Sequence, residues 1–369
     1  MKILYDYQAL SMQKYGGISR YFYELVQGLK QLPGVSVDVI AKYSQNHYFE
    51  SYFKVDKECH LPGFLRRGAN IINRLYVLSC NRKAYDIIHP TYYHPYILNK
   101  FRGKMVITIH DMIYELFADQ FENSKKVIEH KRKHIFAADK IICVSKHTKH
   151  DLLKIYPQIN EDKIVVIYHG NSLERIDIQN KMLCIPALSI DITNMKYILF
   201  VGRRDFYKNF TGFIKATAPI LQNDKELKII CAGGGGFNTV EKELISSYQI
   251  LDRCYQINIS DDILPYLYHF ARCFVFPSIY EGFGIPILEA WACKCPIALS
   301  RASCFPEIAQ DGGLYFNTDN EDEMRQVISS LVYNDELRIK LITRGLKLLD
   351  NYNWNKTVTE TLDVYESIV

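Results

Sequence analysis

The sequence predicts an α/β protein with two doubly wound domains, each built on its own parallel sheet. Its 369 residues exceed what one hydrophobic core usually organises, so two domains are expected. Short apolar runs rich in β-branched residues alternate along the chain with longer segments of helical period, as in repeated strand–helix–strand units. Hydrophobic residues make up 48% and charged residues 23%, a globular composition that excludes a largely disordered chain.

Twelve apolar runs are the expected strands, and they divide evenly between the two halves of the chain. In the first half they cover 2–5, 35–40, 86–89, 105–110, 140–144 and 164–168, and in the second half 197–201, 227–232, 254–259, 273–277, 296–300 and 314–316. The segment 171–194 has mixed polarity and no clear period, so we expect the interdomain linker there. The expected domains are 1–180 and 195–353.

Charge and cysteine content exclude several classes of protein. The 45 Lys and Arg residues nearly balance the 41 Asp and Glu residues, which argues against a dedicated nucleic-acid-binding protein. The start MKILYDYQAL lacks the apolar core of a signal peptide, and no apolar run approaches the roughly 18 residues of a spanning helix, so a cytoplasmic location is expected. Cys293 and Cys295 lack a second pair at zinc-ligand spacing, so we expect reduced thiols and no metal site.

The most informative loop lies in the stretch FVFPSIYEGFGIPILE. Ligands of open parallel sheets bind at the carboxyl ends of the strands, here expected to face a cleft between the domains. Glu281 follows an expected strand, Gly282 and Gly284 allow the backbone to approach a ligand, and Pro286 fits the first position of a helix. The N–H groups at that helix start suit a phosphate, while Glu289, about one turn inside, suits neutral hydroxyl groups. A solvated loop and a surface helix charge are the alternative interpretation.

A second loop, GRRDFYKN, follows the expected strand 197–201. Arg203, Arg204 and Lys208 bring three positive charges to one turn, which suits the neutralisation of a diphosphate. A basic turn on the surface is the alternative. The glycine run 233–236 lacks the spacing of a dinucleotide-binding loop, and we expect it to lie near a nucleotide.

Two further positions in the first half follow expected strands. Gly16 and Gly17 precede a helical pattern, and their N–H groups are expected to face the cleft; an ordinary tight turn is the alternative. His110 and Asp111 close the run VITIHD, where His110 suits a ligand contact or, alternatively, a buried structural role. Asp111 either orients His110 or caps the following helix, and both interpretations stay open.

The segment from Glu281 to Glu289 resembles the E-x7-E motif of the retaining glycosyltransferases of family 4, with its usual EGFG-x-P-x-LEA wording. The stretches MKILYDYQALSMQKYGGISRYFYEL, VITIHD, ADKIICVSKHTKHDL and VGRRDFYKN resemble further motifs of the family in the same order. The matches run from Lys2 to about Tyr365. The resemblance implies the GT-B fold: two Rossmann-like domains, the first binding the acceptor and the second the nucleotide sugar, with a final helix at about 354–369 crossing back to the first domain.

The resemblance also implies roles for individual residues. In the family one arginine and the lysine hold the donor's diphosphate, so either Arg203 or Arg204 acts with Lys208. The catalytic residues it implies are His110, Glu281, Arg203 and Lys208. The substrate-binding residues it implies are Gly16, Gly17, Asp111, Arg204, Gly282, Phe283, Gly284, Ile285 and Glu289. No metal or other cofactor is expected, because the family shows no need for one.

The wording GGISRYF and YKN resembles mannosyltransferases of polysaccharide and lipopolysaccharide assembly. It favours GDP-mannose as the donor, with a UDP-sugar as the alternative, and a saccharide or lipid-linked saccharide as the acceptor. Apolar and basic residues at 64–67 and basic residues at 131–134 suit an anionic membrane surface, so peripheral contact with the inner face of a membrane is expected. Solvated surface charge is the alternative for both groups.

Three other functions compete with glycosyl transfer. A nucleotide-sugar epimerase or hydrolase of the same architecture would act on the donor without an acceptor. A non-catalytic sugar-nucleotide or glycolipid-binding protein would bind the donor without turnover. A dinucleotide oxidoreductase is disfavoured, because no G-x-G-x-x-G follows an expected strand.

Overall fold

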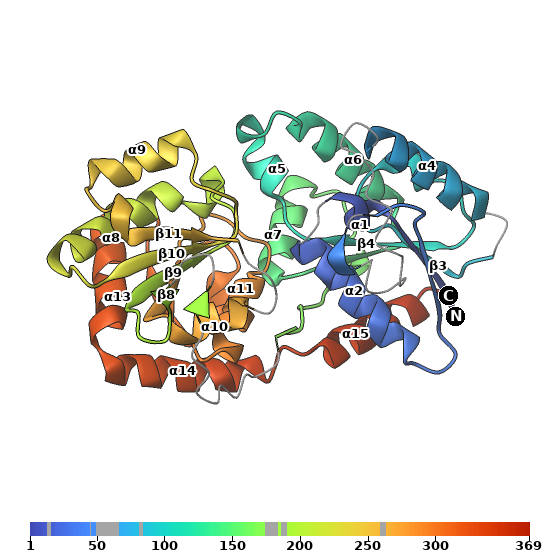
Figure 1. Ribbon diagram of the computed structural model, residues 1–369. Coiled ribbons are helices and arrows are strands. Elements are labelled where there is room, and N and C mark those ends of the chain that lie inside the picture. The colour runs from blue at the N-terminus through green and yellow to red at the C-terminus, as the bar shows by residue number, and fades with distance from the viewer. Residues whose placement is uncertain are drawn as a thin grey trace. The chain divides into compact units, whose positions relative to one another are not determined.

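The polypeptide forms two compact units, unit 1 with Met1–Gly170 and Asn353–Val369, and unit 2 with Asn171–Tyr352 (Figure 1). The computed structural model describes residues 1–12, 16–44, 46–48, 66–80, 84–173, 184–185, 190–258 and 263–369. Each unit contains a six-stranded sheet in which every strand pair is parallel. The expected α/β class with two parallel sheets is therefore confirmed.

The sheet of unit 1 has the order β2-β1-β3-β4-β5-β6. Its strands are β1 (Lys2–Asp6), β2 (Ser36–Ile40), β3 (Ile87–His89), β4 (Lys104–Ile109), β5 (Lys140–Cys143) and β6 (Ile164–Val166). The helices are α1 (Gln8–Met12), α2 (Gly17–Lys30), α4 (Arg66–Ser79), α5 (Ile113–Leu116), α6 (Ser124–Ala137), α7 (Lys146–Ile155) and α15 (Trp354–Glu366). Alternate residues of one strand, such as Ile87 and Ile88, enter two separate apolar clusters, so both faces of the sheet are buried.

The sheet of unit 2 has the order β11-β10-β9-β12-β13-β14. Its strands are β9 (Tyr197–Val201), β10 (Lys228–Ala232), β11 (Cys254–Ile257), β12 (Cys273–Phe276), β13 (Ile297–Ser300) and β14 (Leu314–Phe316). The helices are α8 (Phe210–Asn223), α9 (Thr239–Ser247), α10 (Leu264–Phe270), α11 (Ile285–Ala292), α12 (Phe305–Ala309), α13 (Glu321–Tyr333) and α14 (Asp335–Leu349). All twelve expected strands are present, with ends shifted by at most a few residues. The segment 171–194 also forms a short antiparallel pair, β7 (Cys184–Ile185) with β8 (Ile190–Asp191), which the sequence pattern did not predict.

The last helix of the chain, α15, packs on α2 of unit 1. A Cβ atom at Gly28 would lie 2.4 Å from Val358, so glycine allows the two helices to approach closely. Near the end of α15, the buried Tyr365 hydroxyl lies 2.5 Å from the Tyr5 hydroxyl and 2.6 Å from His89 Nδ1. The expected return of the C-terminal helix to the first half of the chain is thus confirmed, and buried polar contacts hold it there.

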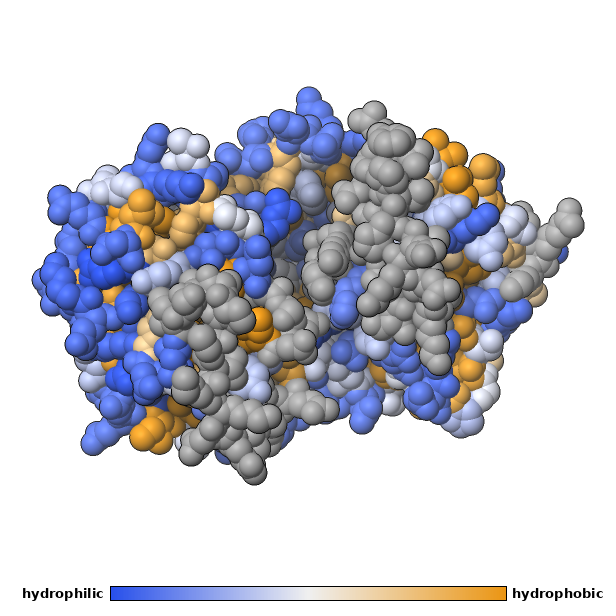
Figure 2. All heavy atoms as spheres, in the orientation of Figure 1, coloured by the Kyte–Doolittle hydropathy of each residue, from blue (hydrophilic) through white to orange (hydrophobic). Residues whose placement is uncertain are grey.

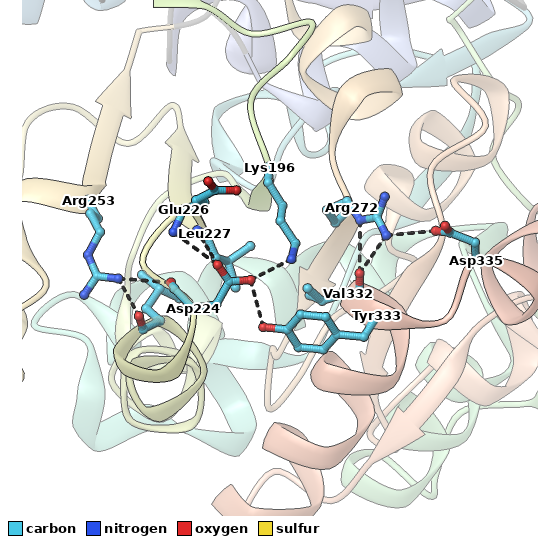
Figure 3. A network of polar contacts seen from close by, with 10 residues as sticks. Lys196, Asp224, Glu226, Leu227, Arg253, Arg272, Val332, Tyr333 and Asp335 are labelled. Carbon is cyan, nitrogen blue, oxygen red and sulfur yellow. Dashed lines mark hydrogen bonds and ion pairs between the residues drawn. The ribbon is translucent and has the colours of Figure 1, made fainter.

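A polar network ties the amino ends of the strands in unit 2 (Figure 3). Asp224, in the turn before β10, accepts hydrogen bonds from Lys196, which precedes β9, and from the Tyr333 hydroxyl of α13, at 2.6 and 3.0 Å. Arg253, before β11, donates to the Asp224 carbonyl at 3.2 Å, and Arg272, before β12, donates to the last turn of α13. These charges stabilise the edge of the sheet opposite to the carboxyl ends of its strands.

Replacing Tyr365 with Phe should lower the free energy of unfolding by about 1–3 kcal/mol, because buried polar atoms of Tyr5 and His89 lose a partner. Tyr43→Phe is the matched control: no hydrogen bond of the Tyr43 hydroxyl is found in the described part of the chain, and its removal should change stability by less than about 0.5 kcal/mol. Urea unfolding of the three proteins measures both values. Equal stability of the Tyr365→Phe and Tyr43→Phe proteins would show that α15 is held by apolar packing alone.

Candidate functional site

The chemistry-bearing loops of unit 2 meet where the strand order reverses. The chain builds β10 and β11 on one side of β9, and then β12, β13 and β14 on the other. The chain therefore leads away from β9 and from β12 in opposite directions along the sheet. Open parallel sheets bind ligands at such a reversal of strand order. The loop after β9 carries the GRRDFYKN motif, and the loop after β12 carries Glu281. The two motifs singled out in the sequence thus lie at one edge of one sheet.

Lys208 and Glu281 form the central contact of this edge. The Lys208 ammonium lies 2.6 Å from Glu281 Oε1, and each side chain is 15% exposed. Glu281 Oε1 also accepts from the Ser278 hydroxyl at 2.7 Å, and the Glu281 amide donates to the Ser303 hydroxyl at 3.0 Å. The Lys208 ammonium also lies over the ring of Phe276, 5.2 Å from its centre. A cation and a carboxylate are therefore held in fixed positions while part of each stays accessible.

The two arginines of the basic loop have different environments. The Arg204 guanidinium is 3% exposed and pairs with Glu241 at 2.8 Å. It also donates to the carbonyls of Gly233, Gly235 and Gly236, so four of its five N–H groups are used within unit 2. The Arg203 side chain is 74% exposed, and Asp205 contacts only its Nε, at 3.2 Å. Arg204 holds the glycine run 233–236 against the loop after β9, while the outer nitrogens of Arg203 point to solvent.

The glycine loop after Glu281 leads directly into helix α11. Gly284 has φ +91°, and a Cβ atom there would lie 2.9 Å from Phe305, so a larger residue would strain the backbone and clash. The helix begins at Ile285, which places Pro286 one residue later than expected. Phe283 is buried, with its ring 6.0 Å from that of Tyr352. These contacts fix the loop whose N–H groups were expected to meet a phosphate.

Glu289 lies in α11 and is only 6% exposed. Its Oε2 accepts a hydrogen bond from the Tyr268 hydroxyl of α10 at 3.0 Å. Burial and the neighbouring carboxylate raise the pKa of Tyr268 well above its usual value, so this hydroxyl stays a donor. The carboxylate is therefore a buried, oriented group rather than the solvated surface charge of the alternative interpretation.

His110 lies at the carboxyl end of β4 in unit 1, inside an aromatic cage. The rings of Tyr21 and Phe22 of α2 meet it edge-on, and the ring of His169 stacks on it at 6.2 Å. Its Nε2 is buried and has no hydrogen-bond partner among the described residues. Burial, assisted by the charge of Lys131, lowers the pKa of His110 to about 3, so the imidazole is neutral at physiological pH. A neutral ring with an unsatisfied buried nitrogen can accept or donate a hydrogen bond to a ligand.

The other expected site residues of unit 1 lie around this cage. Gly16 and Gly17 lead into α2, with extended backbone at Gly16 and the first helical turn starting at Gly17. The Asp111 carboxylate accepts from the Ile113 amide at 3.1 Å, at the start of α5. No hydrogen bond between Asp111 and His110 is found in the described part of the chain, and the cap position of α5 is Met112, so Asp111 braces the turn before the helix and neither expected role is selected.

The basic group at 131–134 is only partly exposed. Lys131 is 1% exposed and pairs with Glu115 at 2.8 Å, and it also donates to the Asp111 carbonyl at 3.0 Å. His134 is fully buried as well. Helix α6 turns these two side chains inward and leaves Arg132 and Lys133 exposed, so the expected membrane contact stays a prediction for these two residues. Residues 64 and 65 lie outside the described part of the chain, and residues 66 and 67 begin α4.

Several residues that complete the site were missed in the sequence. Ser278, Ser303 and Tyr268 orient the two glutamates, and Glu241 orients Arg204. Only Ser278, directly after an expected strand, carries a sequence signal, since the other three are far from any motif. A separate hollow of about 430 Å³ between α8 and α13, lined in part by Asn223 and Tyr333, contains none of the expected site residues. The described residues include no group of three metal-ligating side chains and no helix that is long and apolar enough to cross a membrane.

Comparisons with known proteins agree with this arrangement. Residues 190–348 match the family described as "Glycosyl transferases group 1", and residues 15–175 match "Glycosyltransferase Family 4". The O-antigen chain mannosyltransferase B of Escherichia coli is 27% identical over 95% of this chain and 96% of its own length. A Campylobacter jejuni enzyme, the N-acetylgalactosamine-N,N'-diacetylbacillosaminyl-diphospho-undecaprenol 4-alpha-N-acetylgalactosaminyltransferase, is 30% identical over 54% of this chain and 53% of its own length.

The fold also has solved counterparts. The crystal structure of HepE from Anabaena, in complex with UDP and glucose, superposes with a TM-score of 0.75 at 16% identity and covers 99% of both chains. The two parallel-sheet units have the GT-B fold. The chain belongs to glycosyltransferase family 4, a family of retaining enzymes. This membership selects a glycosyltransferase over the epimerase, hydrolase and non-catalytic alternatives.

Acid should destabilise unit 1 through its buried histidines. Burial lowers the pKa of His89, like that of His110, to about 3, whereas an unfolded histidine has a pKa near 6.5. Below about pH 6.5 the unfolded state binds more protons, so stability falls as pH decreases toward 3. Each histidine should remove about 1.4 kcal/mol per pH unit in this window.

Urea unfolding at pH 7.5, 6.5 and 5.0 measures this loss of stability. The His89→Gln protein should show a shallower pH dependence than the wild type, and the exposed His150→Gln control should match the wild type. An unchanged slope in the His89→Gln protein would mean that His89 is protonated in the folded state.

The buried pair of Lys131 and Glu115 gives a second stability prediction. Lys131→Met should destabilise the protein by about 3–5 kcal/mol, because the Glu115 carboxylate is then buried without a partner. The double variant Lys131→Met/Glu115→Leu should recover most of this loss, since no charge is left unpaired. Thermal unfolding of the two variants and the wild type provides the comparison. A small loss in the single variant would place the pair in contact with water.

Proposed function

We propose that the enzyme transfers a hexose, with mannose favoured, from a nucleotide sugar to a saccharide or lipid-linked saccharide in cell-surface polysaccharide synthesis. The observation that carries this proposal is the Lys208–Glu281 contact at the reversal point of the unit 2 sheet. Mannose transfer is supported by the name of the E. coli relative, and GDP-mannose is the donor that follows from it. A UDP-sugar is the alternative, because HepE was solved with UDP and glucose.

In this proposal unit 2 holds the donor. Negative charge builds on the diphosphate as the bond to the sugar breaks, so cations in fixed positions lower the barrier. Lys208 and Arg203 supply these cations, and Arg203 is favoured over Arg204 because its outer nitrogens are not used inside the protein. The N–H groups of residues 282–285 and the start of α11 add further donors to phosphate oxygens.

The two glutamates have different tasks in this proposal. Glu281 accepts from hydroxyl groups of the transferred sugar, since its Oε2 has no assigned partner among the described residues, whereas Oε1 is held by Lys208 and Ser278. Glu289 accepts from hydroxyl groups of the ribose, with Tyr268 fixing its orientation. No metal is needed, because the diphosphate charge meets protein cations.

Unit 1 supplies the acceptor side and His110 in the same proposal. The neutral imidazole contacts a hydroxyl of the transferred sugar through its unsatisfied Nε2. In the same proposal the backbone carbonyl of His110 stabilises the positive charge that develops on that sugar. Gly16, Gly17 and Asp111 shape the surroundings of this histidine. A neutral ring is required for this task, because a charged imidazolium would repel a sugar that develops positive charge.

Glu281→Ala should lower kcat by about 100-fold or more, and Lys208→Ala should both raise the donor KM and lower kcat, because each group acts on charge that develops during transfer. Lys215→Ala is the matched control: this exposed lysine of unit 2 pairs with Glu321 at 3.0 Å and should leave both constants unchanged. Transfer from GDP-mannose, UDP-glucose and ADP-glucose is measured with each folded protein. A wild-type rate of transfer in the Glu281→Ala protein would refute the site. If the wild-type protein binds none of the three donors, the proposed function is refuted.

A further inference from the structure

The strand order of unit 1 reverses between β1 and β3, next to β4, the strand that His110 follows. Such a reversal is a preferred ligand position, yet the residues directly after β1, at 7–12, and those after β3, at 90–97, have no part in the proposed function. Asp6, the last residue of β1, is fully buried, and its carboxylate accepts from the Thr91 hydroxyl at 2.7 Å and the Tyr96 hydroxyl at 2.8 Å. These bonds tie the two loops together and fix the side chains that surround them.

Polar and aromatic side chains next to Asp6 form a continuous row of five residues: Arg74, Tyr7, Tyr96, His94 and His130. Arg74 of α4 donates from Nε to the Tyr7 hydroxyl at 3.2 Å, and the Tyr7 ring lies 5.8 Å from that of Tyr96. The His94 ring lies 5.7 Å from Tyr96 and 5.2 Å from His130 of α6. Segments far apart in the chain thus place a guanidinium, two phenol rings and two imidazoles along one edge.

Positive charge in this row exceeds the negative charge available to balance it. Within the described ranges Arg74 makes no ion pair. Lys126 lies one helical turn before His130 on α6 and therefore on the same face, and within these ranges it makes no ion pair either. Asp6 is already engaged by neutral donors, and Glu129 pairs with Lys133 at 2.6 Å. Burial and then the charge of Arg74 lower the pKa of His94 to about 4, so His94 remains a neutral hydrogen-bond group beside the cations. An anion is the ligand that this surplus favours.

Helix α4 presents an exposed apolar face beside Arg74. Ile71, Ile72, Leu75 and Tyr76 are between 41% and 63% exposed, and the helix buries Asn73 and Val77 instead. Figure 2 shows hydrophobic atoms gathered over α4. Ile71 precedes Arg74 by three residues, so the two side chains lie on the same side of the helix. An apolar group bound on Ile71 and Leu75 would therefore continue directly from an anion bound at Arg74.

We propose that Arg74, His94, His130 and Lys126 bind the phosphate or diphosphate of an acceptor whose long apolar chain lies on Ile71 and Leu75. This inference rests on the proposed function, because it names the acceptor class of the same reaction. Charge complementarity and the adjacent apolar face together select a ligand that carries both features. The Campylobacter relative, whose printed name includes diphospho-undecaprenol, supports a substrate of this chemistry.

Binding of three probes to the full chain tests the subsite: geranylgeranyl diphosphate, geranylgeraniol and pyrophosphate, measured by microscale thermophoresis. Geranylgeranyl diphosphate should bind at least about ten-fold more tightly than either of the other two. Arg74→Gln and Leu75→Ser should each weaken it by about ten-fold, through the lost charge and the lost apolar contact. Equal binding of pyrophosphate would overturn the apolar half of the proposal, and unchanged binding by the Arg74→Gln protein would overturn the subsite.

Two control variants match the two changes. Arg132→Gln removes a cation that lies two residues from His130 on α6 and therefore on another face of the helix. Ile339→Ser removes an apolar side chain of unit 2 that is 65% exposed, against 63% for Leu75. Both controls should bind geranylgeranyl diphosphate as the wild type does. An equal loss in either control would reveal non-specific attraction and contradict the proposal.

Two further measurements separate this proposal from its neighbours. Binding to phosphatidylglycerol vesicles tests a general membrane contact: if Arg74→Gln and Leu75→Ser weaken vesicle binding but not geranylgeranyl diphosphate binding, the face docks on a membrane and the subsite is wrong. Nucleotide-sugar binding and acceptor-free donor hydrolysis should stay at wild-type levels in both variants. Absence of nucleotide-sugar binding in the wild type would instead refute the proposed function of unit 2.

Discussion

Parallel strand pairing is the constraint on which the candidate site depends. When all strands of a sheet run the same way, every loop that leaves a carboxyl end emerges at one edge. In unit 2 this brings Lys208 and Glu281, 73 positions apart in the chain, to a distance of 2.6 Å. This pair lies where the strand order reverses between β9 and β12, a position at which open parallel sheets bind ligands. Charges at the opposite edge, such as Asp224 and Lys196, serve stability (Figure 3).

Unit 1 uses buried polar groups to place its own ligand edge. The hydroxyl of Tyr365 joins the last helix to Tyr5 and His89 in the sheet, and Lys131 joins α6 to Glu115 and to the backbone beside His110. Because these groups are buried and paired, they fix the positions of the elements that carry them. Removing one partner of such a pair lowers the stability of the fold strongly. The cage around His110 consequently keeps the imidazole neutral, which suits a contact to a sugar that develops positive charge.

The two units show two ways of handling positive charge near a ligand edge. Arg204 donates four N–H groups to Glu241 and to the glycine run after β10, so its guanidinium stabilises the loops within unit 2. Arg203 and Arg74 keep donors available, the first beside the expected donor diphosphate and the second beside the proposed acceptor phosphate. In the proposals made above, the activated sugar and the phosphate-linked acceptor meet separate cations, one set in each unit.

The local sequence pattern was sufficient to predict the strands and the loops that carry the expected site residues. Apolar runs with β-branched residues predicted twelve strands, since burial on both faces of a parallel sheet leaves a strong local signal. Motifs directly after strands predicted the loops that carry Glu281, Lys208 and His110, because strand direction alone assigns them to the carboxyl edge. The basic run at 131–134 did not show that Lys131 is buried against Glu115 while Arg132 and Lys133 are exposed, since helical phase and distant partners decide which charges face solvent.

By itself, the sequence determined the α/β class, the strands and the loops that bear the chemistry, because these follow from residues close together in the chain. Only the tertiary structure showed that Arg204 is bonded inside unit 2 while Arg203 is exposed, and that Asp111 accepts from the first amide of α5. It alone showed how Ser278, Ser303 and Tyr268 orient the glutamates. It also brought Arg74, Tyr96 and His130 into one row at the edge of unit 1. These features depend on contacts between residues from separate elements, and such contacts leave no trace in local composition or period.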